Sequence, residues 1–453
     1  MMVALILYFV PDVVGQCNVN SQYDKIVSGY HCSIAQKTDG SFAAWGSGMS
    51  KTGSDLGSPT ALDSTVYTNM TGTPLKVAIG GATGGGSQDQ AILLTTSGLW
   101  AWGKTGAVLK STIASSSSFA RITSPTGANS YGLPTGVLPA NVSELFATWQ
   151  TLVIVTTDGN VWVLTQTNQY IEGNGGTSTA SNQWKQVKIN SSTNLTNVSV
   201  VRGQASSSTV NAFMAVTTTG LVYTWGNSVY LGDGTAVQSK SYATQMTLPS
   251  EFTGAVPKMI AITGGISDSA NARSTYYLLA VSGKLYSLGD NRLKQLGNFS
   301  SALTQATWVQ AQKTSGNNFT DVNFISAQES SSGYPGIAVI TTGGDLYTWG
   351  DDNSGLLGRA TGGGVAQGGW DPGIPNNFVS GTDRAVSCEM GGHTLVFLKV
   401  GSSKFCYVGH KTNGSMGDGD VTSTSPSATL TFDCSNTPSI SICGYVPVSP
   451  SSV

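Results

Sequence analysis

The stretch IAVITTGGDLYTWG (Ile337 to Gly350) decides the fold, because its pattern returns six more times along the chain. An apolar run leads to Thr and Gly, and a second short run ends in Trp-Gly. β-Branched and aromatic residues favour strands, and the Gly supplies the positive φ of a tight turn. The stretch therefore predicts a β-hairpin.

The other six copies keep this order of strand, turn and strand. They are SIAQKTDGSFAAWG (Ser33 to Gly46), AILLTTSGLWAWG (Ala91 to Gly103), LVIVTTDGNVWVLT (Leu152 to Thr165), FMAVTTTGLVYTWG (Phe213 to Gly226), YLLAVSGKLYSLG (Tyr277 to Gly289) and LVFLKVGSSKFCYVG (Leu395 to Gly409). The seven copies end at positions 46, 103, 165, 226, 289, 350 and 409, which are 57 to 63 residues apart. Such even spacing indicates an internal repeat.

Each repeat has room for two further strands. An apolar stretch such as Lys76 to Gly80 or Met259 to Ile262 precedes each hairpin, and Ala243 to Leu248 or Ala428 to Phe432 fits a fourth strand. Four-stranded units repeated around an axis form a β-propeller, which avoids long exposed sheet edges. We therefore predict an all-β fold: a seven-bladed β-propeller of four-stranded antiparallel blades, closed near the N- and C-termini.

The residues that end each repeat are predicted to be structural. The Trp is expected to pack between neighbouring blades, and the Gly to permit close approach of the backbone where the blade narrows. The set is Trp45, Gly46, Trp102, Gly103, Trp225, Gly226, Gly289, Trp349, Gly350 and Gly409.

The whole pattern, from about Ile26 to Phe432, resembles the regulator-of-chromosome-condensation repeat. The residues that carry the likeness are Gly226-Asn227 with Leu231 to Gly234, Gly289 to Asn291 with Gln295 to Gly297, Gly350 to Asn353 with Leu357-Gly358, and, more loosely, Gly29 to His31 and Gly391 to His393. Repeat three departs from it with Leu164-Thr165, repeat five with Leu288-Gly289 and repeat seven with Val408-Gly409. The resemblance implies a seven-bladed propeller whose use varies, from nuclear guanine-nucleotide exchange to secreted inhibition of an enzyme, so it does not fix a function.

Composition excludes some classes of partner. Charged residues are 10% of the 453 and the net charge is −2, so there is no basic patch for nucleic acid. Hydrophobic residues at 39% suffice for a large core. No apolar run approaches the roughly 20 residues that a membrane-spanning helix needs.

The chain divides into three parts. Residues 1–15 hold the apolar run Val3 to Val10 and are predicted to be a signal peptide, with a retained apolar strand as the alternative. Residues 16–446 form the single propeller, and 447–453 are a Ser/Pro-rich tail. Ser439 to Tyr445 is similar to Lys25 to Tyr30, which predicts either a latch beside the first blade or a further unit of a longer precursor.

All six cysteines fall near the two chain ends. Without tight metal-ligand pairs such as C-x-x-C, they are predicted to form disulfides that join these ends in an oxidising compartment, with unpaired buried thiols as the alternative. The disulfide candidates are Cys17, Cys32, Cys388, Cys406, Cys434 and Cys443. Eight N-x-S/T sequons add candidate glycosylation sites. They are Asn69, Asn141, Asn190, Asn194, Asn197, Asn298, Asn318 and Asn413.

No pattern of residues predicts catalysis. The only histidines are His31, His393 and His410; the first two hold equivalent places in repeats one and seven, which favours structural hydrogen bonds. Asp351 to Asn353 and Asp418 to Asp420 lack the EF-hand pattern. We expect no enzyme activity, no catalytic residues, no cofactor and no metal ligands.

Function is therefore predicted from surface character. Low charge, many Ser, Thr and Gly residues and joined ends favour a secreted or cell-surface glycoprotein that self-associates into a fibre, sheath or surface layer. The alternative is a monomeric secreted propeller that binds a protein or glycan through one face. Its candidate anchors are Trp184, Trp308, Trp370 and Tyr131. A third class, an enzyme or a nuclear exchange factor, is disfavoured by the cysteines and the absent motifs.

Overall fold

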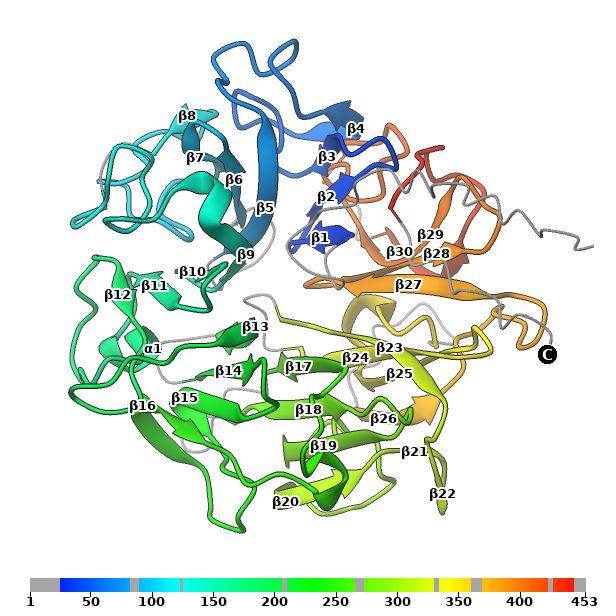
Figure 1. Ribbon diagram of the computed structural model, residues 1–453. Coiled ribbons are helices and arrows are strands. Elements are labelled where there is room, and N and C mark those ends of the chain that lie inside the picture. The colour runs from blue at the N-terminus through cyan, green and yellow to red at the C-terminus, as the bar shows by residue number, and fades with distance from the viewer. Residues whose placement is uncertain are drawn as a thin grey trace, which may run out of the picture.

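The computed structural model describes residues 25–81, 89–122, 125–205, 210–264, 273–329, 334–359, 369–422 and 427–443. Over these ranges the chain forms seven four-stranded antiparallel sheets arranged radially around an axis (Figure 1). The predicted seven-bladed β-propeller is confirmed. The segment 1–15, Cys17 and the tail 447–453 lie outside the described residues.

The blades follow one another along the chain. Blades one to four are β1 (Ile26–Ser28), β2 (Cys32–Gln36), β3 (Phe42–Gly46) and β4 (Leu56–Ala61); β5 (Pro74–Gly81), β6 (Asp89–Thr95), β7 (Gly98–Gly103) and β8 (Ala120–Arg121); β9 (Val142–Thr148), β10 (Thr151–Thr156), β11 (Val161–Thr165) and β12 (Lys185–Gln186); and β13 (Val198–Ala205), β14 (Asn211–Thr217), β15 (Val222–Val229) and β16 (Gln238–Gln245).

The remaining three blades have the same plan. They are β17 (Met259–Thr263), β18 (Thr275–Leu279), β19 (Leu285–Asp290) and β20 (Thr304–Gln310); β23 (Val322–Ala327), β24 (Gly336–Thr341), β25 (Leu346–Asp351) and β26 (Gly369–Gly373); and β27 (Ala385–Met390), β28 (Thr394–Lys399), β29 (Phe405–Lys411) and β30 (Ser427–Asp433). Outside the blades lie the hairpin β21 (Gln312–Thr314) and β22 (Asn317–Asn318), the helix α1 (Gln169–Glu172), and the 3-10 turns η1 (Pro139–Asn141), η2 (Ser250–Phe252) and η3 (Asn353–Gly355).

Within each blade the strands pair in sequence order, so the first strand lies at the axis and the fourth at the rim (Figure 1). The first strands β1, β5, β9, β13, β17, β23 and β27 contact one another in turn, and β27 contacts β1. The ring is therefore closed. Blade one and blade seven are each built from their own four strands, without exchange between the chain ends.

The middle strands of a blade are buried on both faces. Every residue of β6 and β14 is buried, because each sheet is covered by a neighbouring blade on either side. This explains why the repeats read as nearly continuous apolar runs instead of strict alternation. Their hairpin turns use Gly40, Gly159 and Gly220 at φ of +84°, +77° and +88°, as predicted.

The repeat tryptophans lie between blades, as predicted. Each indole is buried, and its Nε1–H donates to a carbonyl of the preceding blade. Trp102 donates to Met49 at 3.1 Å, and Trp225 donates to Ile171 at 2.9 Å. Because the ring is buried and its N–H is hydrogen-bonded to the preceding blade, the indole fixes the spacing of the two sheets.

The repeat glycine allows the predicted close approach. Gly103 has φ of +92°, and a Cβ there would lie 2.6 Å from the carbonyl oxygen of Asp89. Gly226 has φ of +126°, and a Cβ there would lie at the same distance from the carbonyl oxygen of Asn211. Any other residue would be strained at this close approach to the second strand.

The C-terminal segment forms the predicted latch. Ser439 pairs with Lys404 of blade seven, and Ile442 pairs with Lys37 of blade one. Between them, the carbonyl of Ser441 accepts the N–H of Thr38 at 2.9 Å. Ile442 packs with both blades in one apolar cluster. The latch therefore spans the seam where the ring closes.

Candidate functional site

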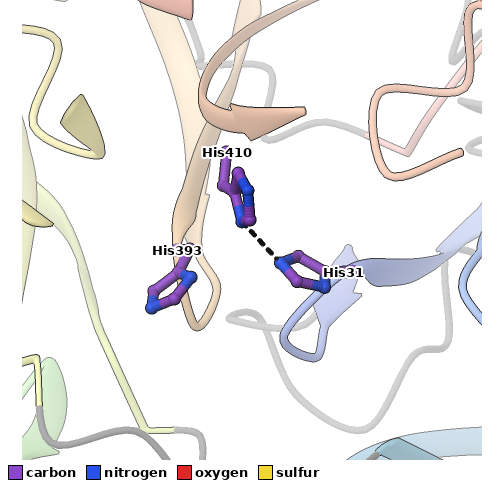
Figure 2. Close-up of side chains that lie close together, drawn as sticks. All are labelled: His31, His393 and His410. Carbon is purple, nitrogen blue, oxygen red and sulfur yellow. Dashed lines mark hydrogen bonds between the residues drawn. The ribbon is translucent and has the colours of Figure 1, made fainter. Parts of the chain in front are cut away.

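The seam between blade one and blade seven gathers all three histidines of the chain. His31 precedes β2, His393 lies between β27 and β28, and His410 lies in β29. Figure 2 shows the rings side by side, with His31 and His410 joined by a hydrogen bond. Among the described residues this is the one group of His, Cys, Asp or Glu side chains close enough to hold a metal ion.

The repeat explains how the three side chains arrive there. The carbonyl of His31 accepts the N–H of Ser47, and the carbonyl of His393 accepts the N–H of His410. Ser47 and His410 each follow the repeat glycine, so His31 and His393 are equivalent, as predicted from the sequence. Closure of the ring then brings the two equivalent positions together.

The cluster is tightly connected. His31 Nε2 lies 2.8 Å from His410 Nδ1, and the Tyr30 hydroxyl lies 2.6 Å from His393 Nε2. One nitrogen of each imidazole lies within 4.8 Å of those of the other two. The Tyr334 ring also contacts His393 in a tilted arrangement, with centroids 4.9 Å apart. The predicted hydrogen bonding of the histidines is present.

Burial favours the neutral form of His393 and His410. His31 and His393 are 2% and 8% exposed. Burial, and then the nearby His31 and His410, lowers the pKa of His393 to about 3. Burial also lowers the pKa of His410. His393 Nδ1 is buried and has no hydrogen-bond partner among the described residues.

Asp89 of blade two holds the backbone that carries His31. Its Oδ2 accepts the backbone N–H groups of Tyr30 at 2.6 Å and His31 at 3.3 Å, and the thiol of Cys32 donates to it at 3.4 Å. Burial raises the pKa of Asp89. Burial, followed by the charge of Asp89, raises the pKa of the Cys32 thiol. Cys32 is therefore a protonated packing residue and not a nucleophile.

The cysteines only partly follow the prediction. Cys406 in β29 and Cys434, directly after β30, form a disulfide within blade seven, and this bond does not join the two chain ends. Cys443 is disulfide-bonded as well. Cys32 and Cys388 are free, so their prediction as disulfide partners is wrong. The reason is that Cys32 packs between blades one and two, whereas Cys388 packs between blades six and seven.

The sequons lie mainly on the surface. Six of them are exposed: Asn69, Asn141, Asn190, Asn194, Asn197 and Asn318. The side chain of Asn413 is half-buried, and its Nδ2 donates across the seam to Asp55 at 2.8 Å. That contact competes with attachment of a glycan to Asn413. Asn298 is half-buried too.

The proposed aromatic anchors are packing residues. Trp184 is buried, and its Nε1 donates to the carbonyl of Gly132 at 2.9 Å. Trp308 and Trp370 are half-buried against interblade clusters, and Tyr131 packs in the same way. None of the four projects freely from a face of the propeller.

The axis holds a small charged cavity. It is lined by the first strands of six blades, and Arg202 within it is 3% exposed. The guanidinium pairs with Glu329 at 3.4 Å and lies over the ring of Phe146. Glu389 also lines the cavity, where it accepts the N–H of Ser28. Arg202 thus offsets the charge of Glu329, and the carboxylate of Glu389 is stabilised by the backbone N–H of Ser28.

The fourth strands form the rim, and most carry protection against edge pairing. β4 and β26 contain Pro59 and Pro372, β16 contains Lys240, and β8 and β12 are two residues long. β20 differs, because its seven residues TQATWVQ include no charge and no proline. It pairs only with β19 in its sheet. Blade four contacts β20 at two hydrogen bonds: the N–H of Gly234 donates to the carbonyl of Ala306, and the Nε1–H of Trp308 donates to the carbonyl of Thr247 at 2.8 Å.

Comparisons with known proteins identify the fold. No protein-family model matches the sequence, and no curated protein sequence does. Yeast RCC1 (Prp20), solved bound to Kap60, superposes with a TM-score of 0.58 at 15% identity, over 91% of this chain and 84% of that one. A second structure of Prp20p from Saccharomyces cerevisiae gives 0.57 at 17% identity, over 90% and 86%. Human WBSCR16 gives 0.55 at 12% identity, over 83% and 84%.

These similarities show that the chain has the fold of the RCC1-type seven-bladed propeller, as the repeat indicated. At such identities they show the fold alone, because one fold serves many functions. In the described part of the chain, no helix has the length and apolar character needed to cross a bilayer.

Proposed function

We propose that this protein is a non-enzymatic, extracellular, glycosylated structural protein that associates with copies of itself through the rim of the propeller. The observation that carries the proposal is β20, a rim strand without a charge or proline. A strand edge of this kind is a template for pairing with a second chain, and most proteins protect such edges.

The surface around β20 supports association. Leu303, directly before the strand, is 65% exposed, and Trp308 and Val309 within it are half-buried. Charged residues are 10% of the chain, so there is little repulsion between copies. Antiparallel pairing of β20 with itself gives a two-fold dimer, whereas pairing with a different rim strand gives an open filament.

Two features support an extracellular location. The Cys406–Cys434 disulfide suits an oxidising compartment. Six exposed sequons could carry glycans that keep the remaining blade edges apart. Asn318 is one of them, and its Nδ2 donates to Gln310 at the end of β20. A glycan there would limit how far a second strand could extend along β20.

The test is the size of the purified, full-length protein with Thr307→Lys, compared with Ser239→Lys. Thr307 is the exposed residue of β20, and Ser239 is an exposed residue of β16, which already carries Lys240. Light scattering after size-exclusion chromatography should show assemblies for the natural chain and for S239K, and a monomer for T307K.

A natural chain that remains a single unit near 46.8 kDa plus glycan would overturn the proposal. That result would favour the alternative, a monomeric propeller that binds a protein or glycan through one face. Assemblies that persist in T307K would show that association does not use β20.

A further inference from the structure

We propose that His31, His393 and His410 bind one divalent transition-metal ion of the zinc type, and that this ion clamps blade seven to blade one. The inference is independent of the proposed self-association. It goes against our expectation from the sequence, in which no metal ligand was predicted.

The donor atoms are almost in place. All three imidazoles offer a nitrogen within 4.8 Å of the others, and His31 Nε2 and His410 Nδ1 are 2.8 Å apart. In a tetrahedral zinc site with Zn–N bonds of about 2.0–2.1 Å, ligand nitrogens are about 3.4 Å apart. Small side-chain rotations therefore convert the cluster into a three-histidine site.

The hydrogen bond between His31 and His410 shows what binding must change. In a neutral pair, one of the two facing nitrogens carries the shared proton. To bind the ion, that ring must move its proton to its other nitrogen, so that both facing nitrogens present lone pairs. Each imidazole keeps one N–H, and no proton leaves the protein.

A separate observation, on the ring nitrogens of His393, also favours a metal ion. Its ring is 8% exposed, and its Nδ1 has no hydrogen-bond partner among the described residues. A buried polar nitrogen without a partner costs free energy. If His393 donates its Nε2–H to the hydroxyl oxygen of Tyr30, 2.6 Å away, the Nδ1 lone pair is available to a metal ion. Metal-binding histidines usually donate their second N–H in this way.

The donor set selects the class of ion. Neutral imidazole nitrogens suit Zn²⁺, Cu²⁺, Ni²⁺ and Co²⁺, whereas Ca²⁺ and Mg²⁺ prefer oxygen. The nearest buried carboxylate, Asp89, is held by the backbone N–H groups of Tyr30 and His31. It therefore acts on the ligands through the backbone. Three protein ligands leave a fourth position for water.

Because the three ligands come from two blades, the ion is expected to stabilise the closed ring. His31 belongs to blade one, and His393 and His410 belong to blade seven, so the ion would link segments 379 residues apart in sequence. The unfolded chain does not hold these rings together. An ion bound only by the folded protein stabilises it, and the gain rises with the logarithm of the ratio of free ion concentration to Kd. The ion would thus act at the same seam as the latch.

The experiment uses the full-length protein without a histidine tag, after removal of metal by EDTA. Because the chain has only three histidines, every imidazole signal comes from this cluster. Titration with ZnCl₂ should show one ion per chain and shift all three sets of imidazole resonances. Co²⁺ should give the visible absorption of a four-coordinate site. At a hundredfold excess over Kd, Zn²⁺ should raise Tm by about 3 °C.

Variants assign the ligands. H31Q, H393Q and H410Q should each reduce Zn²⁺ affinity at least tenfold and abolish the Co²⁺ absorption. C32S and C388S remove the two free thiols and should retain full binding. Y30F keeps all three ligands but removes the hydroxyl on His393, so it should weaken binding by about tenfold.

The proposal fails if Zn²⁺ leaves the imidazole resonances of the natural chain unchanged. It also fails if C32S abolishes binding, or if folded H31Q and H410Q bind as tightly as the natural chain. Should a histidine variant not fold, the resonances and the Co²⁺ spectrum of the natural chain still decide the question.

Discussion

Two interfaces can be compared: the seam between blades seven and one, and the interface between blades three and four. Both hold neighbouring blades together, but they use different contacts. At both, a repeat tryptophan donates to a carbonyl of the preceding blade: Trp225 to Ile171, and Trp45 to Ser415. The regular interface combines apolar packing with polar contacts, such as the N–H of Val201 donated to Glu144 at 2.8 Å and the bridge between Asn174 and Tyr242. The seam adds the histidine cluster, the Asn413–Asp55 contact and the latch.

The difference shows what covalent connection contributes. Elsewhere in the ring, the chain runs directly from one blade into the next, so separating two blades gains little entropy. At the seam the two blades are not consecutive in the sequence, so the chain does not run directly from one into the other. The additional polar contacts and the latch replace the missing connection.

The largest loss in the free energy of unfolding is expected from removal of an interblade indole. Trp225→Ala and Trp45→Ala should each lower the free energy of unfolding by about 3–5 kcal/mol, because each leaves a cavity and an unpaired carbonyl. Denaturant unfolding followed by circular dichroism measures it. Trp308→Ala, at a half-buried position, is the control and should cost clearly less. Equal losses in all three variants would contradict the interblade role.

A smaller effect is expected from the latch, and it should be confined to the seam. Ile442→Ala should lower the free energy of unfolding by about 2–3 kcal/mol, because Ile442 is buried with residues of both blades. Hydrogen exchange should increase in β2 and β29 and stay unchanged in β10 and β14.

The matched control for the latch is Val421→Ala, since Val421 is 46% exposed. It should leave both stability and exchange unchanged. Uniformly faster exchange around the whole ring in I442A would show that the seam is no weaker than the other interfaces.

The smallest expected effect on the free energy of unfolding comes from Asp352, a buried acid away from the seam. Burial raises the pKa of Asp352, beside β25, to about 6. Between about pH 4 and pH 6 the unfolded chain has released this proton while the folded protein retains it, so the free energy of unfolding falls as pH rises. The contribution is about 2 kcal/mol.

Asp352→Asn should remove this dependence, because the amide can still accept the N–H of Leu357 but carries no charge. Denaturant unfolding at pH 4, 5, 6 and 7 measures the slope. Asp158→Asn, at an exposed turn, is the control and should preserve it. An unchanged slope in D352N would assign the pH dependence to other groups.

The repeat predicted the fold because its information is local. Each copy, such as Ile337 to Gly350, contains its own strands, turn glycine and interblade tryptophan, so the blade count follows from counting copies. The close backbone approach at Gly226 and the interblade packing of Trp225 followed from the same pattern.

The histidine cluster could not be predicted in the same way. His31 and His410 are 379 residues apart, and only closure of the ring places them in contact. A usable signal existed, since all three histidines fall in repeats one and seven, which are neighbours in a ring. The even number of cysteines was misleading, because pairing depends on which interface each residue faces, and Cys32 and Cys388 face different ones.

Each blade is a single uninterrupted segment of chain, and this has a consequence for rearranged versions of the protein. In propellers whose ends share one sheet, moving the termini divides a blade. Here a circular permutant opened between any two blades would retain all seven sheets. The new connection would have to preserve the pairing of Ser439 with blade seven and of Ile442 with blade one.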